Sequence, residues 1–125
     1  MPNERENGGS VLVVDDDYSV RALISTTLKR NGFDVTMATN GRIGVEHVRA
    51  TPDRYKLILL DNHMPEMDGL TACRVIRQFA PKSPVVLMSS ETEPDDLEAS
   101  GAREFFPKPF QAADLINLVD RHIVS

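Results

Sequence analysis

Residues 57–69 read LILLDNHMPEMDG, and their pattern indicates the kind of sheet that the chain forms. Its four leading apolar residues indicate a strand buried on both faces, as strands are in a parallel sheet covered by helices above and below. The strand then runs into a single carboxylate, Asp61. Because burying an unpaired charge is costly, Asp61 is expected at an edge of the sheet or beside a partner.

Four more segments predict strands. Val11–Val14 and Val85–Met88 are continuous apolar runs like the first, whereas Phe33–Ala38 and Glu104–Phe106 are more mixed. Helical patterns follow each strand. The expected helices are one capped by Asp17 and ended by Gly32, one over Gly41–Ala50, one from about Asp68, a short one around Asp95–Ser100, and one burying Leu115, Ile116 and Val119.

Five strand–helix repeats predict an α/β fold with right-handed crossovers and one parallel sheet. Pro107 falls at the end of the fifth strand, and proline favours an edge strand. A flavodoxin-like (βα)5 doubly wound sheet in the order 2-1-3-4-5 puts that strand at an edge and the three continuous apolar strands inside. We therefore expect this order.

Composition limits the function classes. The chain has 125 residues and a net charge of −5, which suits one globular domain and disfavours direct binding to nucleic acid or an anionic membrane. It shows no signal peptide and no apolar run of membrane-spanning length, and its one cysteine, Cys73, suits a reducing compartment. We expect a cytoplasmic protein with a flexible tail over residues 1–9 and one domain over residues 10–125.

Polar residues follow four of the predicted strands, and the carboxyl ends of parallel strands share one edge of a sheet. Three carboxylates in one cleft repel one another unless a cation joins them, and oxygen ligands select a hard cation such as Mg²⁺. With a lysine and a hydroxyl nearby, this chemistry suits phosphoryl transfer to a carboxylate. The residues are Asp15, Asp16 and Asp17, then Asp61, then Ser89 and Ser90, and finally Lys108.

Four motifs, VLVVDDD, LILLDNHMPEMDGL, VVLMSS and FFPKPF, occur in this order and together resemble the receiver domain of bacterial two-component response regulators. The resemblance covers about Ser10 to Ile123. It implies that Asp61 is the phosphoacceptor and that Asp15 and Asp16 hold Mg²⁺, with Mn²⁺ as the alternative ion. It also implies that the metal binds Asp61 and the backbone carbonyl of His63.

The same resemblance implies a switch. Ser89 takes the position whose hydroxyl bonds the new phosphoryl oxygen, and Lys108, followed by a cis bond to Pro109, pairs with another. Phe105 takes the position of an aromatic ring that turns inward, which reshapes the surface around the fourth and fifth strands. Asp17 is read as a helix cap, and the side chains of His63 and His122 as exposed groups without a chemical role.

The implied partners are a sensor histidine kinase or phosphotransfer protein and a downstream effector or output domain. Such a domain assists its own phosphorylation and dephosphorylation but is not a turnover enzyme. Two alternatives remain: a freestanding aspartate-nucleophile phosphatase or phosphotransferase, and a phosphorylation-independent binding module. The former class carries a second acid two residues after its nucleophile, where this chain has His63.

Overall fold

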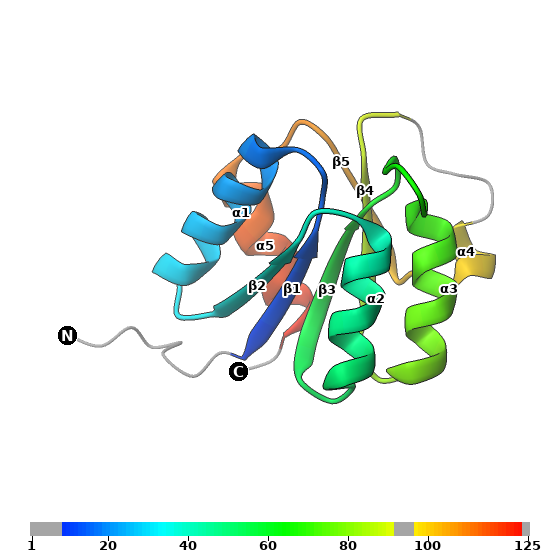
Figure 1. Ribbon diagram of the computed structural model, residues 1–125. Helices are drawn as coiled ribbons and strands as arrows, with labels where there is room; N and C mark the ends of the chain where they lie inside the picture. Colours follow the sequence, from blue (N-terminus) through cyan, green and yellow to red (C-terminus); the bar gives the residue numbers. More distant parts are fainter. Residues whose placement is uncertain (1–8, 92–96, 124–125) are drawn as a thin grey trace.

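The computed structural model describes residues 9–91 and 97–123 and contains one five-stranded parallel sheet in the order β2-β1-β3-β4-β5. This confirms the predicted order, with β5 and its terminal proline at an edge (Figure 1). The strands are β1 (Ser10–Val14), β2 (Asp34–Ala38), β3 (Tyr55–Asp61), β4 (Val85–Ser89) and β5 (Glu104–Pro107).

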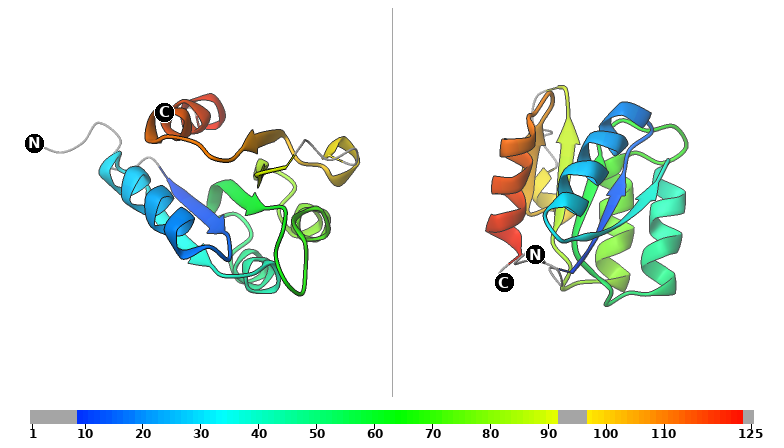
Figure 2. Two further views of the ribbon diagram at one scale, coloured as in Figure 1. Left: turned by 90° about the horizontal axis from the view of Figure 1, so that it is seen from above. Right: turned by 90° about the vertical axis from the view of Figure 1, so that its left-hand side faces the viewer.

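Helices cover both faces of the sheet. Figure 2 shows α1 and α5 on one face and α2 and α3 on the other, with the short α4 beside α3. The helices are α1 (Tyr18–Arg30), α2 (Gly41–Ala50), α3 (Gly69–Phe79), α4 (Leu97–Ser100) and α5 (Ala112–His122). The predicted start of the fourth helix and all of the predicted tail except Gly9 lie outside the described residues.

The continuous apolar strands supply two cores. Along β3, Leu57 and Leu59 face α1 and α5, while Ile58 and Leu60 face α2 and α3. All four residues are fully buried. Because successive side chains of a strand point to opposite faces, a strand covered on both sides is apolar at every position. Polar residues therefore follow the apolar runs at the point where the strands leave the two cores.

Capping residues fix where α1 and α3 begin, and so shape the connections at the carboxyl ends of β1 and β3. The Asp17 carboxylate accepts hydrogen bonds from the backbone N–H groups of Ser19 and Val20, which confirms it as the cap of α1. The Asp68 carboxylate accepts from the N–H of Thr71 at the start of α3.

Close packing explains the two glycines in α2. A Cβ atom on Gly44 would lie 2.7 Å from Cγ2 of Val14, and one on Gly41 would lie 2.8 Å from the carbonyl oxygen of Met67. Glycine therefore lets α2 approach β1 and the β3–α3 connection.

Helix α5 differs from its prediction in two places. Leu115, Leu118 and Val119 are buried, whereas Ile116 is only partly covered. The prediction of His122 as an exposed residue is wrong: its side chain is 7% exposed, and its Nε2 lies 2.7 Å from Oε1 of Glu104. His122 follows Leu118 by four residues and Val119 by three, so it continues the buried face of the helix.

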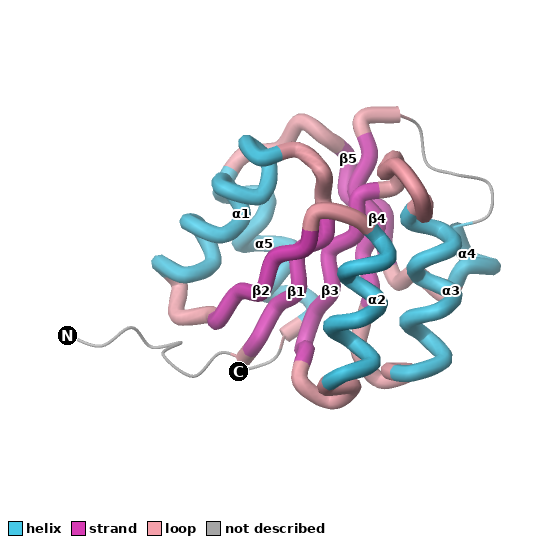
Figure 3. The backbone as a smooth tube through the Cα atoms, viewed as in Figure 1, coloured by secondary structure: helices cyan, strands magenta, loops and turns pink. Residues whose placement is uncertain are grey.

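Figure 3 shows the loops that join the strands to the helices, with the β1–α1, β3–α3 and β5–α5 connections at the same edge of the sheet. None of the helices within residues 9–91 and 97–123 is long and apolar enough to cross a membrane.

Candidate functional site

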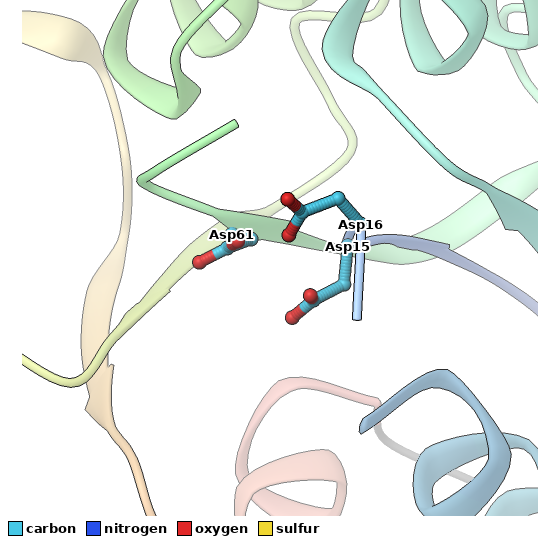
Figure 4. Close-up of side chains that lie close together, drawn as sticks. All are labelled: Asp15, Asp16 and Asp61. Carbon is cyan, nitrogen blue, oxygen red and sulfur yellow. The ribbon is translucent and has the colours of Figure 1, made fainter. Parts of the chain in front are cut away.

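Three carboxylates meet at the carboxyl edge of the sheet. Asp15 and Asp16 follow β1, Asp61 ends β3, and each offers an oxygen within 4.8 Å of the others (Figure 4). Strands β1 and β3 are neighbours in the sheet, so the predicted switch in strand order brings these acids together. We call Asp15, Asp16, Asp61 and the lysine described next the carboxyl-edge cluster.

Lys108 enters this cluster from the β5–α5 connection. Its Nζ donates to Oδ2 of Asp15 at 2.7 Å and to Oδ1 of Asp61 at 3.1 Å. Its backbone N–H donates to the carbonyl of Ser89 at 2.8 Å, and its bond to Pro109 is cis, as the resemblance implies. The ammonium therefore bridges the two acids.

The cluster has more negative than positive charge. The three carboxylates carry −3 and the ammonium carries +1, which leaves −2. Burial raises the pKa of Asp61, and the charge of Asp15 raises it further. Together they outweigh Lys108, which lowers this pKa. Burial pulls the pKa of Lys108 down, but its bonds with Asp15 and Asp61 outweigh this and raise it overall. A divalent cation would neutralise the remainder.

The donor set fits Mg²⁺. All three side chains offer oxygen atoms, which hard cations prefer, and their surplus charge matches that of the ion. Asp16 is exposed and opens the cluster to solvent, whereas Asp15 is fully buried and Asp61 is 5% exposed. The N–H of His63 donates to Oδ1 of Asp61 at 3.5 Å, so the backbone of His63 lies against the Asp61 carboxylate.

Ser89 and Phe105 lie on the strands next to the cluster. Ser89 is 1% exposed at the end of β4, and its Oγ accepts a hydrogen bond from the N–H of Glu91 at 3.0 Å. The adjacent Ser90 is exposed. Phe105 is half-buried on β5 and pairs in register with Leu87 of β4.

The imidazole of His63 contacts Glu91, two residues after Ser89. Its Nε2 is 3.4 Å from Oε2 of Glu91, and both side chains are more than half exposed, at 53% and 70%. This contact joins the β3–α3 connection to the residue that bonds Ser89.

Sequence reasoning missed two further residues near the acids. Arg21 of α1 donates from Nη1 to the carbonyl of Asp15 at 2.8 Å, which ties the first helix to the site. Asn62 follows Asp61 directly and is 9% exposed, with its Oδ1 unpaired among the described residues. A polar side chain continuing a buried strand was the available signal for Asn62, and none marked Arg21.

A doubly wound parallel sheet with a lysine-bridged acidic cluster at its carboxyl edge defines a flavodoxin-like domain equipped for a cation and a phosphoryl group. The family model for the response regulator receiver domain matches residues 11–120. The chain belongs to this family, the receiver domains of two-component systems.

Relatives that are similar in sequence support this family assignment. The chain is 34% identical over 116 residues to the chemotaxis protein CheY of Bacillus subtilis, covering 89% of this chain and 94% of that protein. It is 35% identical over 118 residues to the transcription factor SKN7 of Candida albicans, covering 92% of this chain and 21% of that protein. The chain spans 21%, 46% and 24% of the length of three of the curated relatives it matches.

Solved structures agree as well. The chemotaxis protein CheY4 of Vibrio cholerae superposes with a TM-score of 0.85 at 29% identity, covering 92% of this chain and 98% of that one. The receiver domain of the sensor histidine kinase PA1611 of Pseudomonas aeruginosa superposes with a TM-score of 0.83 at 28% identity, covering 94% and 99%. That structure has a magnesium ion coordinated in its active-site cleft.

Proposed function

We propose that Asp61 accepts a phosphoryl group from the phosphohistidine of a sensor histidine kinase or phosphotransfer protein. The carrying observation is the surplus negative charge around a buried carboxylate that a single lysine bridges. Within the described residues, Oδ1 of Asp61 accepts a hydrogen bond from Lys108. Oδ2 accepts none and keeps some contact with solvent. Oδ2 is therefore the oxygen free to attack.

The transfer forms one bond and breaks another. An oxygen of Asp61 bonds to phosphorus as the nitrogen–phosphorus bond of the donor breaks, and the imidazole nitrogen leaves with the bonding electron pair. Mg²⁺, or Mn²⁺ in its place, held by Asp15, Asp16, Asp61 and the carbonyl of His63, would neutralise charge on the phosphoryl oxygens. The ammonium of Lys108, already 3.1 Å from Oδ1, would pair with one of those oxygens.

The new acyl phosphate would then act through Ser89 and Phe105. The Ser89 hydroxyl would donate to a phosphoryl oxygen, and Phe105, half-buried on the neighbouring strand, would turn inward. This changes the surface around β4 and β5, which a downstream effector or output domain would read. The free, buried thiol of Cys73 supports a reducing, cytoplasmic setting.

Two other functions fit less well. A freestanding aspartate-nucleophile phosphatase would need a second acid where this chain has His63, whose imidazole points to Glu91 instead. A phosphorylation-independent binding module would have no use for the buried acids and the lysine that bridges them. The proposed domain is a switch that assists its own phosphorylation and dephosphorylation without repeated turnover.

Incubation with Mg²⁺ and a small phosphodonor such as acetyl phosphate tests the proposal. Intact-protein mass spectrometry should find one phosphoryl group per chain in the wild type and none in Asp61→Asn. Asp68→Asn is the matched control, because it changes an exposed acid of the same connection that serves only as the cap of α3.

Other outcomes contradict the proposal in distinct ways. Many turnovers of phosphodonor per chain would favour a phosphatase. A complete lack of label in the wild type would favour a binding module. Equal labelling of Asp61→Asn and the wild type would exclude Asp61 as the acceptor.

A further inference from the structure

Asn62 follows the proposed acceptor directly, and the chemistry above gives its side chain no role. The residue is 9% exposed, and its Oδ1 is buried without a hydrogen-bond partner among the described residues. A buried acceptor without a donor destabilises the arrangement that contains it, and native structures hold few of them. A second arrangement in which a neighbouring N–H donates to this atom would remove that cost.

The backbone of Asn62 is fully engaged, so its unpaired atom does not come from a loose loop. Its N–H donates to the carbonyl of Met88 at 2.8 Å, and its carbonyl accepts from the N–H of Gly69 at 3.1 Å. A Cβ atom on Gly69 would lie 2.8 Å from Cα of Asn62, so the start of α3 packs directly against this residue. The backbone of Asn62 is therefore fixed directly after a central strand.

Asn62 lies beside the serine of the proposed switch. Asp61 pairs in register with Met88, so the next residues along the two strands, Asn62 and Ser89, stand opposite each other. Asn62 is one residue beyond the end of β3, but its N–H still bonds to the carbonyl of Met88 as a ladder residue would. Continuing the alternation of the two strands by one residue places both side chains on the face of Leu60 and Leu87, which belong to the core under α2 and α3. Asn62 Oδ1, which has no donor, is thus on the same face as Ser89 Oγ, which already accepts from the N–H of Glu91.

The donor held by Ser89 is the N–H of Glu91, 3.0 Å from Oγ. If the hydroxyl turns from one staggered rotamer to another, Oγ moves by roughly 2 Å, which breaks this hydrogen bond. The freed N–H is then available to another acceptor close to the end of β4. Asn62 Oδ1 is a buried acceptor without a partner among the described residues, and the backbone of Asn62 is bonded to Met88 of β4.

We propose that Asn62 is the second acceptor of a hydrogen-bond exchange: in the resting protein the Glu91 N–H is bonded to Ser89 Oγ, and in the phosphorylated protein it is bonded to Asn62 Oδ1. The inference rests on the proposed function, because phosphorylation of Asp61 is what draws the Ser89 hydroxyl away. The unpaired Oδ1 destabilises the resting state, and its pairing stabilises the phosphorylated one. Asn62 therefore shifts the population toward the active state.

The substitution Asn62→Leu tests this exchange, with Mg²⁺ and beryllofluoride as the stable mimic of the phosphoryl group. Leucine removes the unpaired acceptor from the resting state and leaves the Glu91 N–H without its new acceptor in the loaded state. We expect the free variant to melt at a higher temperature than the wild type. We expect its apparent affinity for beryllofluoride to fall by about fivefold, the factor that one ordinary hydrogen bond supplies.

Ser83→Ala is the matched control. Ser83 is 5% exposed, and its hydroxyl donates to the carbonyl of Tyr55 at 2.7 Å at the opposite edge of the sheet. This variant should lose stability in both states and keep the wild-type affinity for beryllofluoride. An Asn62→Leu variant with unchanged affinity, or with a lower melting temperature in the free state, overturns the exchange.

A measurement on the wild type does not depend on the folding of a variant. In protein labelled with ¹⁵N and ¹³C, a scalar coupling across the hydrogen bond between the Glu91 amide nitrogen and Cγ of Asn62 should appear only with beryllofluoride bound. Binding without this coupling, or the coupling in both states, overturns the inference alone. Failure of the wild type to bind beryllofluoride contradicts the proposed function, and the exchange falls with it.

Discussion

Two clusters in this protein contain similar groups and reach opposite electrostatic states. The carboxyl-edge cluster sets three acids against one lysine, and the pKa of Asp61 is raised, first by burial and then by Asp15. The β5–α5 cluster, made of Glu104, Arg121 and His122, sets one acid against two basic side chains. There burial acts to raise the pKa of Glu104, but the hydrogen bonds and charge interactions with His122 and Arg121 together outweigh it, and the pKa is lowered.

The difference separates a site from a structural contact. The β5–α5 cluster joins the first residue of β5 to the last turn of α5, and its charges are compensated by its own members. The carboxyl-edge cluster keeps a surplus that no side chain in it neutralises. A strained arrangement of this kind, located where ligands bind in open parallel sheets, is typical of a functional site.

The largest expected effect on stability comes from removing a basic side chain, and it should differ between the two clusters. Lys108→Met leaves two buried acids uncompensated and should lower the free energy of unfolding by about 3–5 kcal/mol at pH 7 without Mg²⁺. Arg121→Met removes an exposed partner and should cost less than about 1 kcal/mol. Urea denaturation measures both, and equal losses would erase the proposed contrast between the clusters.

Mg²⁺ should act on one cluster only. At a hundred times its Kd, the ion should stabilise the wild type by about 2.7 kcal/mol, because it binds the folded state. The gain should shrink in Asp61→Asn, which loses a ligand, and persist in Glu104→Gln, which leaves the acidic site intact. Thermal denaturation with and without chelator measures this, and an equal gain in all three proteins would place the ion elsewhere.

Amide substitutions in the two clusters should have opposite signs. Since the pKa of Asp61 is raised from 3.8, its charged form costs stability as pH rises through and above that value. Asp61→Asn should therefore stabilise the metal-free protein at pH 7, by about 0.5–2 kcal/mol, and give no gain below pH 3.8.

Glu104 works the other way, because its pKa is lowered from 4.5. Its contribution is complete above pH 4.5 and is lost as pH falls through the lowered pKa. Glu104→Gln should therefore destabilise the protein at pH 7, by about 1 kcal/mol, and lose this effect in acid. Unfolding curves from pH 2 to 8 test both signs, and the same sign for both variants would refute the comparison.

The smallest effect is expected at the contact between His63 and Glu91. His63 and Glu91 form an exposed contact, and such pairs are worth at most about 1 kcal/mol. If this contact positions groups around the acyl phosphate, His63→Ala should change its half-life by no more than about fivefold. A phosphate-release assay measures the half-life, and identical values for variant and wild type would show that the imidazole is a spectator.

The fold was readable from the sequence because each level of the chain agrees with the others. Continuous apolar strands required cover on both faces, and Pro107 marked an edge. The boundaries were less accurate: β3 extends over Tyr55–Asp61 rather than Leu57–Leu60, because the ladders to β1 and β4 continue beyond the apolar run.

The site was readable as a set of acids at one sheet edge, but its internal contacts were not. That Lys108 bridges Asp15 and Asp61 depends on the path of the β5–α5 connection, which no local pattern encodes. The burial of His122 depends on the pairing of α5 with β5. The unpaired Oδ1 of Asn62 follows from how α3 and β4 close around it.

We propose that Asp61, and none of its acidic neighbours, takes the phosphoryl group. Borohydride reduces an acyl phosphate to an alcohol, which converts a phosphorylated aspartate into homoserine that peptide mass spectrometry can locate. After treatment with acetyl phosphate and Mg²⁺, we predict homoserine at position 61 alone. Homoserine at position 15 or 16, with Asp61 unchanged, would contradict the account.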